Sequence, residues 1–232
     1  MNDKYIRTGD IDAARKLITT YHYSRRMPGC IILTATVHLG GGLFGDCGEP
    51  IAAITFSNPT AKWSEQILEL SRLVRINDTD YLLTQLISFA CKEIHRRREY
   101  DLLISFADKT HGHHGGIYQA ASWFYAGMRK GAMDGLIIND KFLPGRTCNA
   151  RFNTRSPERL KKLHSQWNIK PHYDEGKYLY WKPLNRSGIR KAKRLGLTLN
   201  KYPKPDAAEV SKVIHPGSAG KGKVQFLDAA NV

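Results

Sequence analysis

The sequence predicts an α/β (α+β) fold in which a mixed central sheet is flanked by helices. Short β-branched apolar runs alternate with amphipathic stretches along the chain. Two strand-like runs, residues 30–39 and 51–56, are joined by a glycine-rich loop, which indicates an antiparallel hairpin. Strand-like and helix-like segments then alternate, which is typical of a mixed sheet covered by helices.

The individual elements follow from periodicity and capping. Asp10 is expected to cap a helix whose apolar stripe contains Leu17 and Ile18. Asp78 or Thr79 is expected to cap a second helix over residues 80–98. Further strands are expected over 67–76, 102–107, 136–138 and 177–181, and further helices over 117–128, 159–167 and 186–194.

The composition indicates an intracellular protein with a polyanionic partner. The 232 residues include 36 Lys+Arg against 21 Asp+Glu, and a net charge of +15 favours nucleic acid as that partner. The sequence contains no apolar run long enough to span a membrane, its first residues lack a signal-peptide pattern, and its four cysteines form no C-x-x-C pair. We therefore expect reduced thiols, no membrane partner and a cytoplasmic location.

One domain over residues 1–198 and a flexible basic tail over residues 199–232 are expected. The tail is rich in proline and glycine, and residues 186–232 carry 10 Lys+Arg against 3 Asp+Glu. The sequence alone leaves open the oligomeric state and whether this tail is ordered.

The order of elements resembles the GNAT acyltransferase superfamily, and a set of short motifs resembles the Mom family, whose phage proteins hypermodify adenine in DNA. The matching pieces run in order from about residue 20 to residue 205. They are Y-H-Y-S at 21–24, F-S-N-P at 56–59, E-L-S-R-L at 69–73, S-F-A-D at 105–108, G-G-I-Y-Q-A at 115–120, W-F-Y at 123–125, Y-L-Y-W-K-P-L at 178–184 and Y-P-K at 202–204.

The Mom resemblance implies an enzyme, a transferase that converts the adenine 6-amino group of double-stranded phage DNA to an N6-carbamoylmethyl derivative. Such a modification would protect the DNA from host restriction, and the protein would act in the host cytoplasm. The alternatives are a GNAT-type N-acetyltransferase acting on a small amine or a protein, and a DNA-binding module without catalysis.

Candidate catalytic residues lie in the matched motifs. The resemblance places His22 and Tyr23 at the active site, although a histidine after a helix also meets the helix dipole favourably. Asp108 follows an apolar strand, where α/β sheets hold their ligand crevices, and would act as a base or orient a catalytic group. Tyr118 is expected to donate or relay a proton, as tyrosines at this helix often do in GNAT enzymes.

Two further candidates come from the strands. Arg72 lies on an otherwise apolar strand and would bind the donor or a DNA phosphate, or pair with Glu69 or Asp108. Ser57, in the F-S-N-P turn, is a weaker candidate for the catalytic site.

A metal site and the donor remain open at this stage. Asp108, His22 and His111 form the first candidate ligand set for iron or zinc, although the histidine-rich segment at 108–116 also reads as a solvated glycine-rich turn. The donor of the modifying group, of acyl or glycinamide type, is not identified. Acetyl-CoA is a doubtful donor because the segment before the second helix has no glycine and carries Asp78 and Asp80, which would repel a pyrophosphate.

Basic side chains predict contacts with DNA phosphates. Adenine N6 is poorly accessible inside a duplex, so catalysis requires base flipping or a deformed duplex. Each phosphate contact adds a salt-dependent term to affinity. The candidate contacts are Arg25, Arg26, Arg151, Arg155, Arg190, Lys191, Lys193 and Arg194.

Overall fold

A computed structural model describes residues 4–40, 48–59, 63, 66–76 and 80–204. The chain divides into two compact units, which are treated separately below. Unit 1 comprises residues 1–107, 113–128 and 178–203, and unit 2 comprises residues 108–112, 129–177 and 204–232.

Unit 1 is built on a seven-stranded sheet with the strand order β1-β2-β3-β4-β5-β10-β6. Antiparallel pairing joins β1 through β4, whereas β4 and β5 are parallel, so the sheet is mixed. The predicted α/β class with a mixed central sheet is confirmed. The strands are β1 (Lys4–Thr8), β2 (Ile31–Leu39), β3 (Pro50–Ser57), β4 (Ile67–Arg75), β5 (Leu102–Asp108), β6 (Phe124–Arg129) and β10 (Lys177–Pro183).

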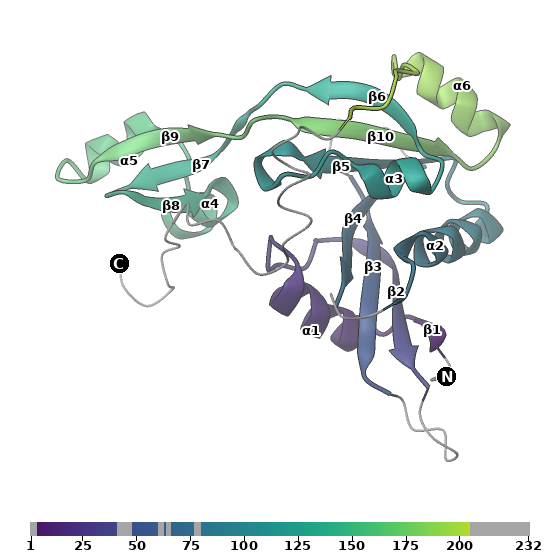
Figure 1. The fold of residues 1–232 in the computed structure, drawn as a ribbon. Helices are drawn as coiled ribbons and strands as arrows, with labels where there is room; N and C mark the ends of the chain where they lie inside the picture. Colours follow the sequence, from purple (N-terminus) through teal and green to yellow (C-terminus); the bar gives the residue numbers. More distant parts are fainter. Residues whose placement is uncertain (1–3, 41–47, 60–62, 64–65, 77–79, 205–232) are drawn as a thin grey trace. The chain divides into compact units, whose positions relative to one another are not determined.

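Helices cover both faces of this sheet (Figure 1). On one face, α1 (Ile11–Tyr21) buries Leu17 and Ile18 against Ala53 and Val74. On the other face, α2 (Leu83–Arg97) packs into the main core. The alternation of side chains along β3 produces this division, because successive residues of a strand point to opposite faces. Unit 1 also contains α3 (Gly116–Ala120) and α6 (Arg186–Arg194), and α6 has the bounds that the sequence predicted.

A side-chain cap marks the start of α1 but not the start of α2. The Asp10 side chain accepts a hydrogen bond from the Ala13 N–H at 3.0 Å, which confirms the predicted cap of α1. The cap position of α2 is Leu82, whose side chain makes no capping hydrogen bond. The expectation that Asp78 or Thr79 caps a helix beginning at residue 80 is therefore wrong, because α2 begins at Leu83; Asp78 and Thr79 themselves lie outside the described residues.

The helix predicted over residues 117–128 is wrong beyond Ala120. Ser122 has a positive φ of 59°, and the chain reverses there into β6. Trp123 and Tyr125 are buried whereas Phe124 between them is exposed, which is the period of a strand. Apolar residues at positions 120, 121, 124 and 128 also satisfy a helical period, so the pattern alone did not separate the two structures.

Unit 2 contains a three-stranded sheet of order β8-β7-β9. Its core gathers apolar side chains from the sheet and from α4 and α5, among them Leu136, Leu143 and Leu160. Ser156 caps α5 by accepting from the Arg159 N–H at 3.3 Å. The elements are η1 (Lys109–His111), β7 (Met133–Ile138), β8 (Lys141–Pro144), α4 (Gly145–Phe152), α5 (Pro157–Leu163) and β9 (Ile169–Tyr173).

The first residues of the predicted tail contact unit 1. The Asn200 N–H donates to the Tyr125 carbonyl, and the Tyr202 hydroxyl donates to the Trp123 carbonyl, both at 2.9 Å. Residues 205–232 lie outside the described residues, so the prediction for the rest of the tail stays a prediction. No helix in the described part of the chain is long and apolar enough to cross a membrane.

Candidate active site

The parallel ladder between β4 and β5 is short, and the candidate site lies where it ends. Register pairs run only from Ile67 opposite Leu102 to Glu69 opposite Ile104, although both strands continue for several described residues. Just past the ladder, the Ser105 hydroxyl donates to the Leu70 carbonyl at 2.9 Å. This end of the ladder lies toward the carboxyl ends of both strands, the side on which α/β sheets hold their ligands.

Tyr118 is buried beside this point, with 8% of its surface exposed. Its side chain is hydrogen-bonded to Ser105. The contact with Ser105 acts to lower the pKa of Tyr118, but burial has the largest influence on it. Burial raises the pKa of Tyr118, and the nearby Tyr23, Glu69 and Tyr180 also act in this direction. Tyr118 is therefore a neutral phenol with a proton to give.

Tyr180 holds the start of α3 in place. Its hydroxyl donates to the His114 carbonyl at 2.6 Å and accepts from Gln119 Nε2 at 3.0 Å. Its ring lies 5.2 Å from the Tyr118 ring, between centroids. Gly115 has φ +86°, and a Cβ there would lie 2.2 Å from the Tyr180 ring. Only glycine fits this turn, because any side chain would meet both strain and the buried ring.

His22 and Tyr23 follow α1 in the same unit. His22 is buried, and its Nδ1 accepts a hydrogen bond from the Ser24 N–H at 3.1 Å, with the Ser24 hydroxyl 2.9 Å away. An accepting Nδ1 leaves the proton of the neutral ring on Nε2. Tyr23 is 44% exposed, and its ring centroid lies 4.3 Å from that of His22 and 5.6 Å from that of His113.

Arg72 and Ser57 have structural contacts in unit 1. Arg72 Nε donates to the Arg26 carbonyl at 2.9 Å, and Arg72 Nη1 donates to the Ser71 carbonyl at 2.6 Å. The guanidinium thereby ties β4 to the segment that follows α1. Ser57 is buried and its hydroxyl is hydrogen-bonded to that of Ser71.

Glu69 and Tyr180 are two neighbours of Tyr118 that the sequence reasoning did not select as site residues. Both lie inside motifs that carry the Mom resemblance, E-L-S-R-L and Y-L-Y-W. Each influences the pKa of Tyr118, and Glu69 is the last β4 residue in the ladder. The motifs therefore contained these two residues. The alternating pattern of a strand does not show which of its side chains lie near Tyr118.

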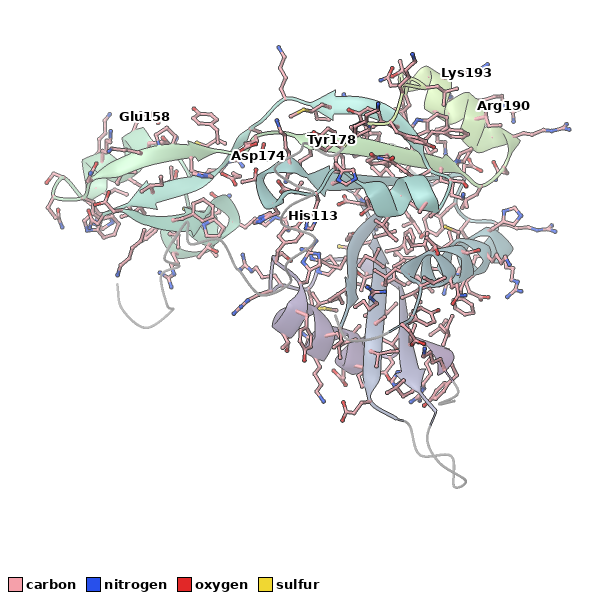
Figure 2. The ribbon with its side chains drawn as sticks, viewed as in Figure 1. His113, Glu158, Asp174, Tyr178, Arg190 and Lys193 are labelled. Carbon is pink, nitrogen blue, oxygen red and sulfur yellow. The ribbon has the colours of Figure 1, made fainter. Side chains whose placement is uncertain are left out.

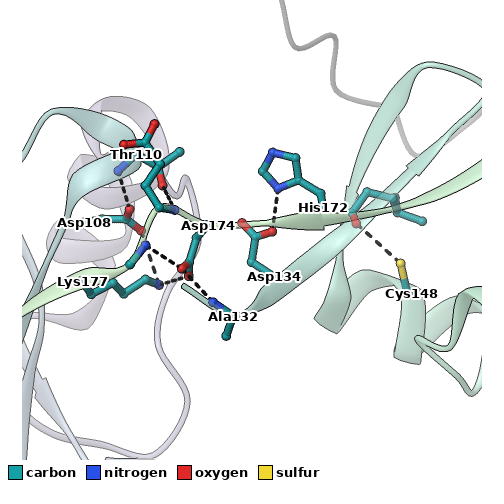
Figure 3. Close-up of polar contacts among 11 residues, drawn as sticks. Asp108, Thr110, Ala132, Asp134, Cys148, His172, Asp174 and Lys177 are labelled. Carbon is teal, nitrogen blue, oxygen red and sulfur yellow. Dashed lines mark hydrogen bonds and ion pairs between the residues drawn. The ribbon is translucent and has the colours of Figure 1, made fainter. Parts of the chain in front are cut away.

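Asp108 and His111 belong to unit 2, whereas His22, Tyr23 and Tyr118 belong to unit 1. Asp108 caps the short helix η1 by accepting from the Thr110 N–H at 3.1 Å, and its other oxygen lies 3.4 Å from Lys177 Nζ (Figure 3). Lys177 Nζ also lies 3.6 Å from Asp174, so one ammonium group serves two carboxylates. These contacts fix the Asp108 carboxylate within the first turn after β5.

The described residues do not assemble a metal site. No group of three His, Cys, Asp or Glu side chains among them is arranged to hold one ion. The predicted set of Asp108, His22 and His111 spans both units and stays a prediction.

The expectation that the segment before α2 disfavours acetyl-CoA also stays a prediction. Asp80 is ion-paired with Lys4, which lowers the pKa of this exposed carboxyl, and Asp78 lies outside the described residues.

Most of the predicted phosphate-binding side chains are exposed, and one is not. Arg190 and Lys193 extend from α6 (Figure 2). Lys191, which lies between these two residues in the sequence, is buried. Its Nζ lies 3.1 Å from Asp101 and 2.8 Å from Gln66 Oε1. This ion pair gives Lys191 a structural role, and we omit it from the DNA contacts below. The other exposed members are Arg25, Arg26, Arg151, Arg155 and Arg194.

A family model described as the Mom protein family matches residues 3–204. The chain belongs to the Mom family. Membership supports phage DNA modification as the general function and agrees with the motifs found in the sequence. None of the curated proteins matches the sequence.

Several solved structures are similar to this Mom-family chain at low identity. An N-acetyltransferase from Staphylococcus aureus Mu50 is 11% identical with a TM-score of 0.45, over 78% of this chain and 98% of that one. The ribosomal-protein-S18-alanine N-acetyltransferase from Escherichia coli is 10% identical with a TM-score of 0.46, over 80% and 97%. A GNAT family acetyltransferase from Elizabethkingia anophelis, with acetyl-CoA bound, is 9% identical with a TM-score of 0.44, over 79% and 99%.

Proposed function

We propose that this Mom-family chain is a transferase that converts the 6-amino group of adenine in double-stranded DNA to an N6-carbamoylmethyl group. The modified DNA would resist host restriction. The observation that carries the proposal is the buried, protonated Tyr118, hydrogen-bonded to Ser105 at the end of the β4–β5 ladder of a Mom-family protein.

The reaction needs an acid and a base. A bond forms between adenine N6 and the carbamoylmethyl carbon, while the bond between that carbon and the leaving group of the donor breaks. N6 gives up one proton, and the leaving group takes up one proton. The N6 lone pair is delocalised into the purine ring, so removal of its proton by a base makes the nitrogen more reactive.

Tyr118 has the properties required of the acid. Its phenol stays protonated well above neutral pH because burial disfavours the phenolate. Ser105 holds the hydroxyl in one orientation, which reduces the entropy lost on reaching the transition state. We assign proton donation to the leaving group to Tyr118 Oη.

The base is assigned to a carboxylate. Asp108 is the candidate from its motif, and its carboxylate is held in place by contacts with the Thr110 N–H and with Lys177 Nζ. Glu69 in unit 1 is the second candidate because it acts on the pKa of Tyr118. His22 and Tyr23 would shape the adenine pocket, and Arg72 would hold the segment that carries them.

DNA would bind through exposed basic side chains on both units. Unit 1 contributes Arg25, Arg26, Arg190, Lys193 and Arg194, and unit 2 contributes Arg151 and Arg155. Contacts of such side chains with phosphates would position the protein on the duplex without reading its sequence. The target adenine would have to leave the base stack to meet Tyr118.

The test compares wild-type protein with Tyr118→Phe and Tyr125→Phe. Each is expressed with a plasmid in bacteria, and the nucleosides of the recovered DNA are analysed by mass spectrometry. We expect carbamoylmethyl-deoxyadenosine from the wild type and from Tyr125→Phe, and at least a 100-fold reduction in Tyr118→Phe, in the range typical of a lost general acid. Full modification by a folded Tyr118→Phe protein would refute the role of Tyr118. A product of acetyl mass would instead favour an N-acetyltransferase reaction.

A further inference from the structure

A pocket of about 450 Å³ lies in unit 1 between one side of α2, the end of α3 and the end of β10. This volume is within the range of pockets that bind small organic ligands. Residues that line it on α2 run from Thr84 to His95. At 1.5 Å of rise per residue, that stretch is about 16 Å long, enough for a nucleotide-sized molecule. None of the residues of the candidate active site lines this pocket.

The charged side chains around the pocket are all basic. Lys92 and His95 lie one helical turn apart on α2, and Lys182 faces them from β10. None of the lining residues, all of which are described, is acidic. Two ammonium groups and an imidazole in one concave surface favour an anionic ligand with at least two negative charges.

Lys182 is held in a fixed position. Its Nζ donates to the Ala121 carbonyl at 3.1 Å and to the Ser122 carbonyl at 3.3 Å, just after α3 ends. An ammonium group oriented in this way loses little side-chain entropy when a ligand binds. Its charge also acts on the thiol of Cys91, another residue that lines the pocket.

The rest of the lining separates into polar and apolar parts. Thr84, Ser88 and Ser122 contribute hydroxyl groups, which donate readily to phosphate oxygens. Pro183 and Leu184, which are partly exposed, contribute apolar surface beside them. A free inorganic ion would leave this apolar surface uncovered, whereas an organic phosphate would contact both parts.

We propose that this pocket binds a small organic phosphate of nucleotide size. Lys92 and Lys182 would pair with the phosphate groups, and Pro183 and Leu184 would contact the organic body. The inference goes beyond the proposed modification of adenine. Its test measures binding, so it can fail while the proposed function stands, and the reverse also holds.

The first test is titration of the full-length protein with a fluorescent ADP analogue, followed by fluorescence anisotropy. Lys92→Gln is the main variant because Lys92 is exposed and its replacement leaves the packing unchanged. We expect it to weaken binding about tenfold, the effect of losing one charge-assisted hydrogen bond. Lys16→Gln, an exposed lysine on α1 in the same unit that does not line the pocket, is the matched control and should bind the analogue as the wild type does.

Competition identifies the ligand chemistry. Unlabelled ADP should displace the analogue, and pyrophosphate should displace it more weakly because it lacks the organic body. Absence of binding at millimolar analogue would overturn the proposal, and so would equal weakening in Lys92→Gln and Lys16→Gln. Displacement by a 20-base-pair duplex but not by ADP would also overturn it, because the surface would then belong to the DNA interface.

A footprint locates the bound molecule. Ser88 lines the pocket and is exposed, so Ser88→Cys introduces an alkylation target there. Cys30 is exposed and does not line the pocket, so it is the internal reference. ADP should slow alkylation at position 88 at least fivefold and leave Cys30 unchanged. Equal rates at position 88 with and without saturating ADP would place the molecule elsewhere and refute the assignment.

Discussion

Replacement of Gly115 by alanine tests how the start of α3 is held. Gly115 has φ +86°, where an L-residue costs about 1 kcal/mol relative to glycine. The added Cβ would also lie 2.2 Å from Tyr180 Cε2 and 2.5 Å from Cζ. Tyr180 is fully buried and hydrogen-bonded at its hydroxyl, so the ring has little room to move. Overpacking of this kind costs about 1–3 kcal/mol, which gives a total loss of about 2–4 kcal/mol.

Gly9→Ala is the matched control for this substitution. Gly9 also lies in unit 1 and has φ +82°, but a Cβ there would have no atom within 4 Å. It should therefore cost only the conformational term of about 1 kcal/mol. Urea unfolding followed by tryptophan fluorescence measures both losses. Equal losses in Gly115→Ala and Gly9→Ala would refute the contact between Gly115 and Tyr180. Gly115→Ala should also reduce DNA modification, because Tyr118 shares α3 with the displaced turn.

Three further predictions concern charge and protonation. Lys191→Met should lower the free energy of unfolding by about 2–3 kcal/mol, because Asp101 would lose its buried ion pair, and should leave the salt dependence of DNA affinity unchanged. Lys193→Met should have the opposite effects. Its free energy of unfolding should stay within about 0.5 kcal/mol of wild type, and its DNA affinity should depend less steeply on salt concentration. A stability loss in Lys193→Met but not in Lys191→Met would contradict the structure. Burial raises the pKa of Tyr180 to about 12, so stability present below pH 10 should decline as pH rises from 10 toward 12, and Tyr180→Phe should flatten that decline in urea titrations. Asp108→Ala should abolish modification while DNA binding stays measurable in a gel-shift assay; retained modification would remove Asp108 from the mechanism.

The sequence predicted the elements whose pattern is set by local chemistry. Asp10 identified the start of α1 because its side chain bonds to a backbone N–H only three residues away. The basic run at 186–194 gave the bounds of α6. In contrast, β6 was predicted as helix because its apolar spacing fits both periods, and only pairing with β10 determines the strand. The short strands β1 and β9 likewise depend on partners distant in sequence.

The candidate site was predictable as motifs but not as an arrangement. Tyr118 and Tyr23 were selected from matched motifs, and the structure brings them near enough to influence each other's charge. Tyr180 was not selected, because its contacts with His114 and Gln119 join residues more than 60 positions apart. Lys191 was selected for charge alone. The sequence shows no sign that it alone, among the basic residues of α6, turns inward to Asp101.

The measurement that tests the central claim most directly is the nucleoside composition of plasmid DNA from cells that express this chain. Digestion and mass spectrometry should reveal a deoxyadenosine that carries a carbamoylmethyl group, reduced at least 100-fold by Tyr118→Phe. Unmodified deoxyadenosine from cells that contain folded wild-type protein would contradict the proposed reaction.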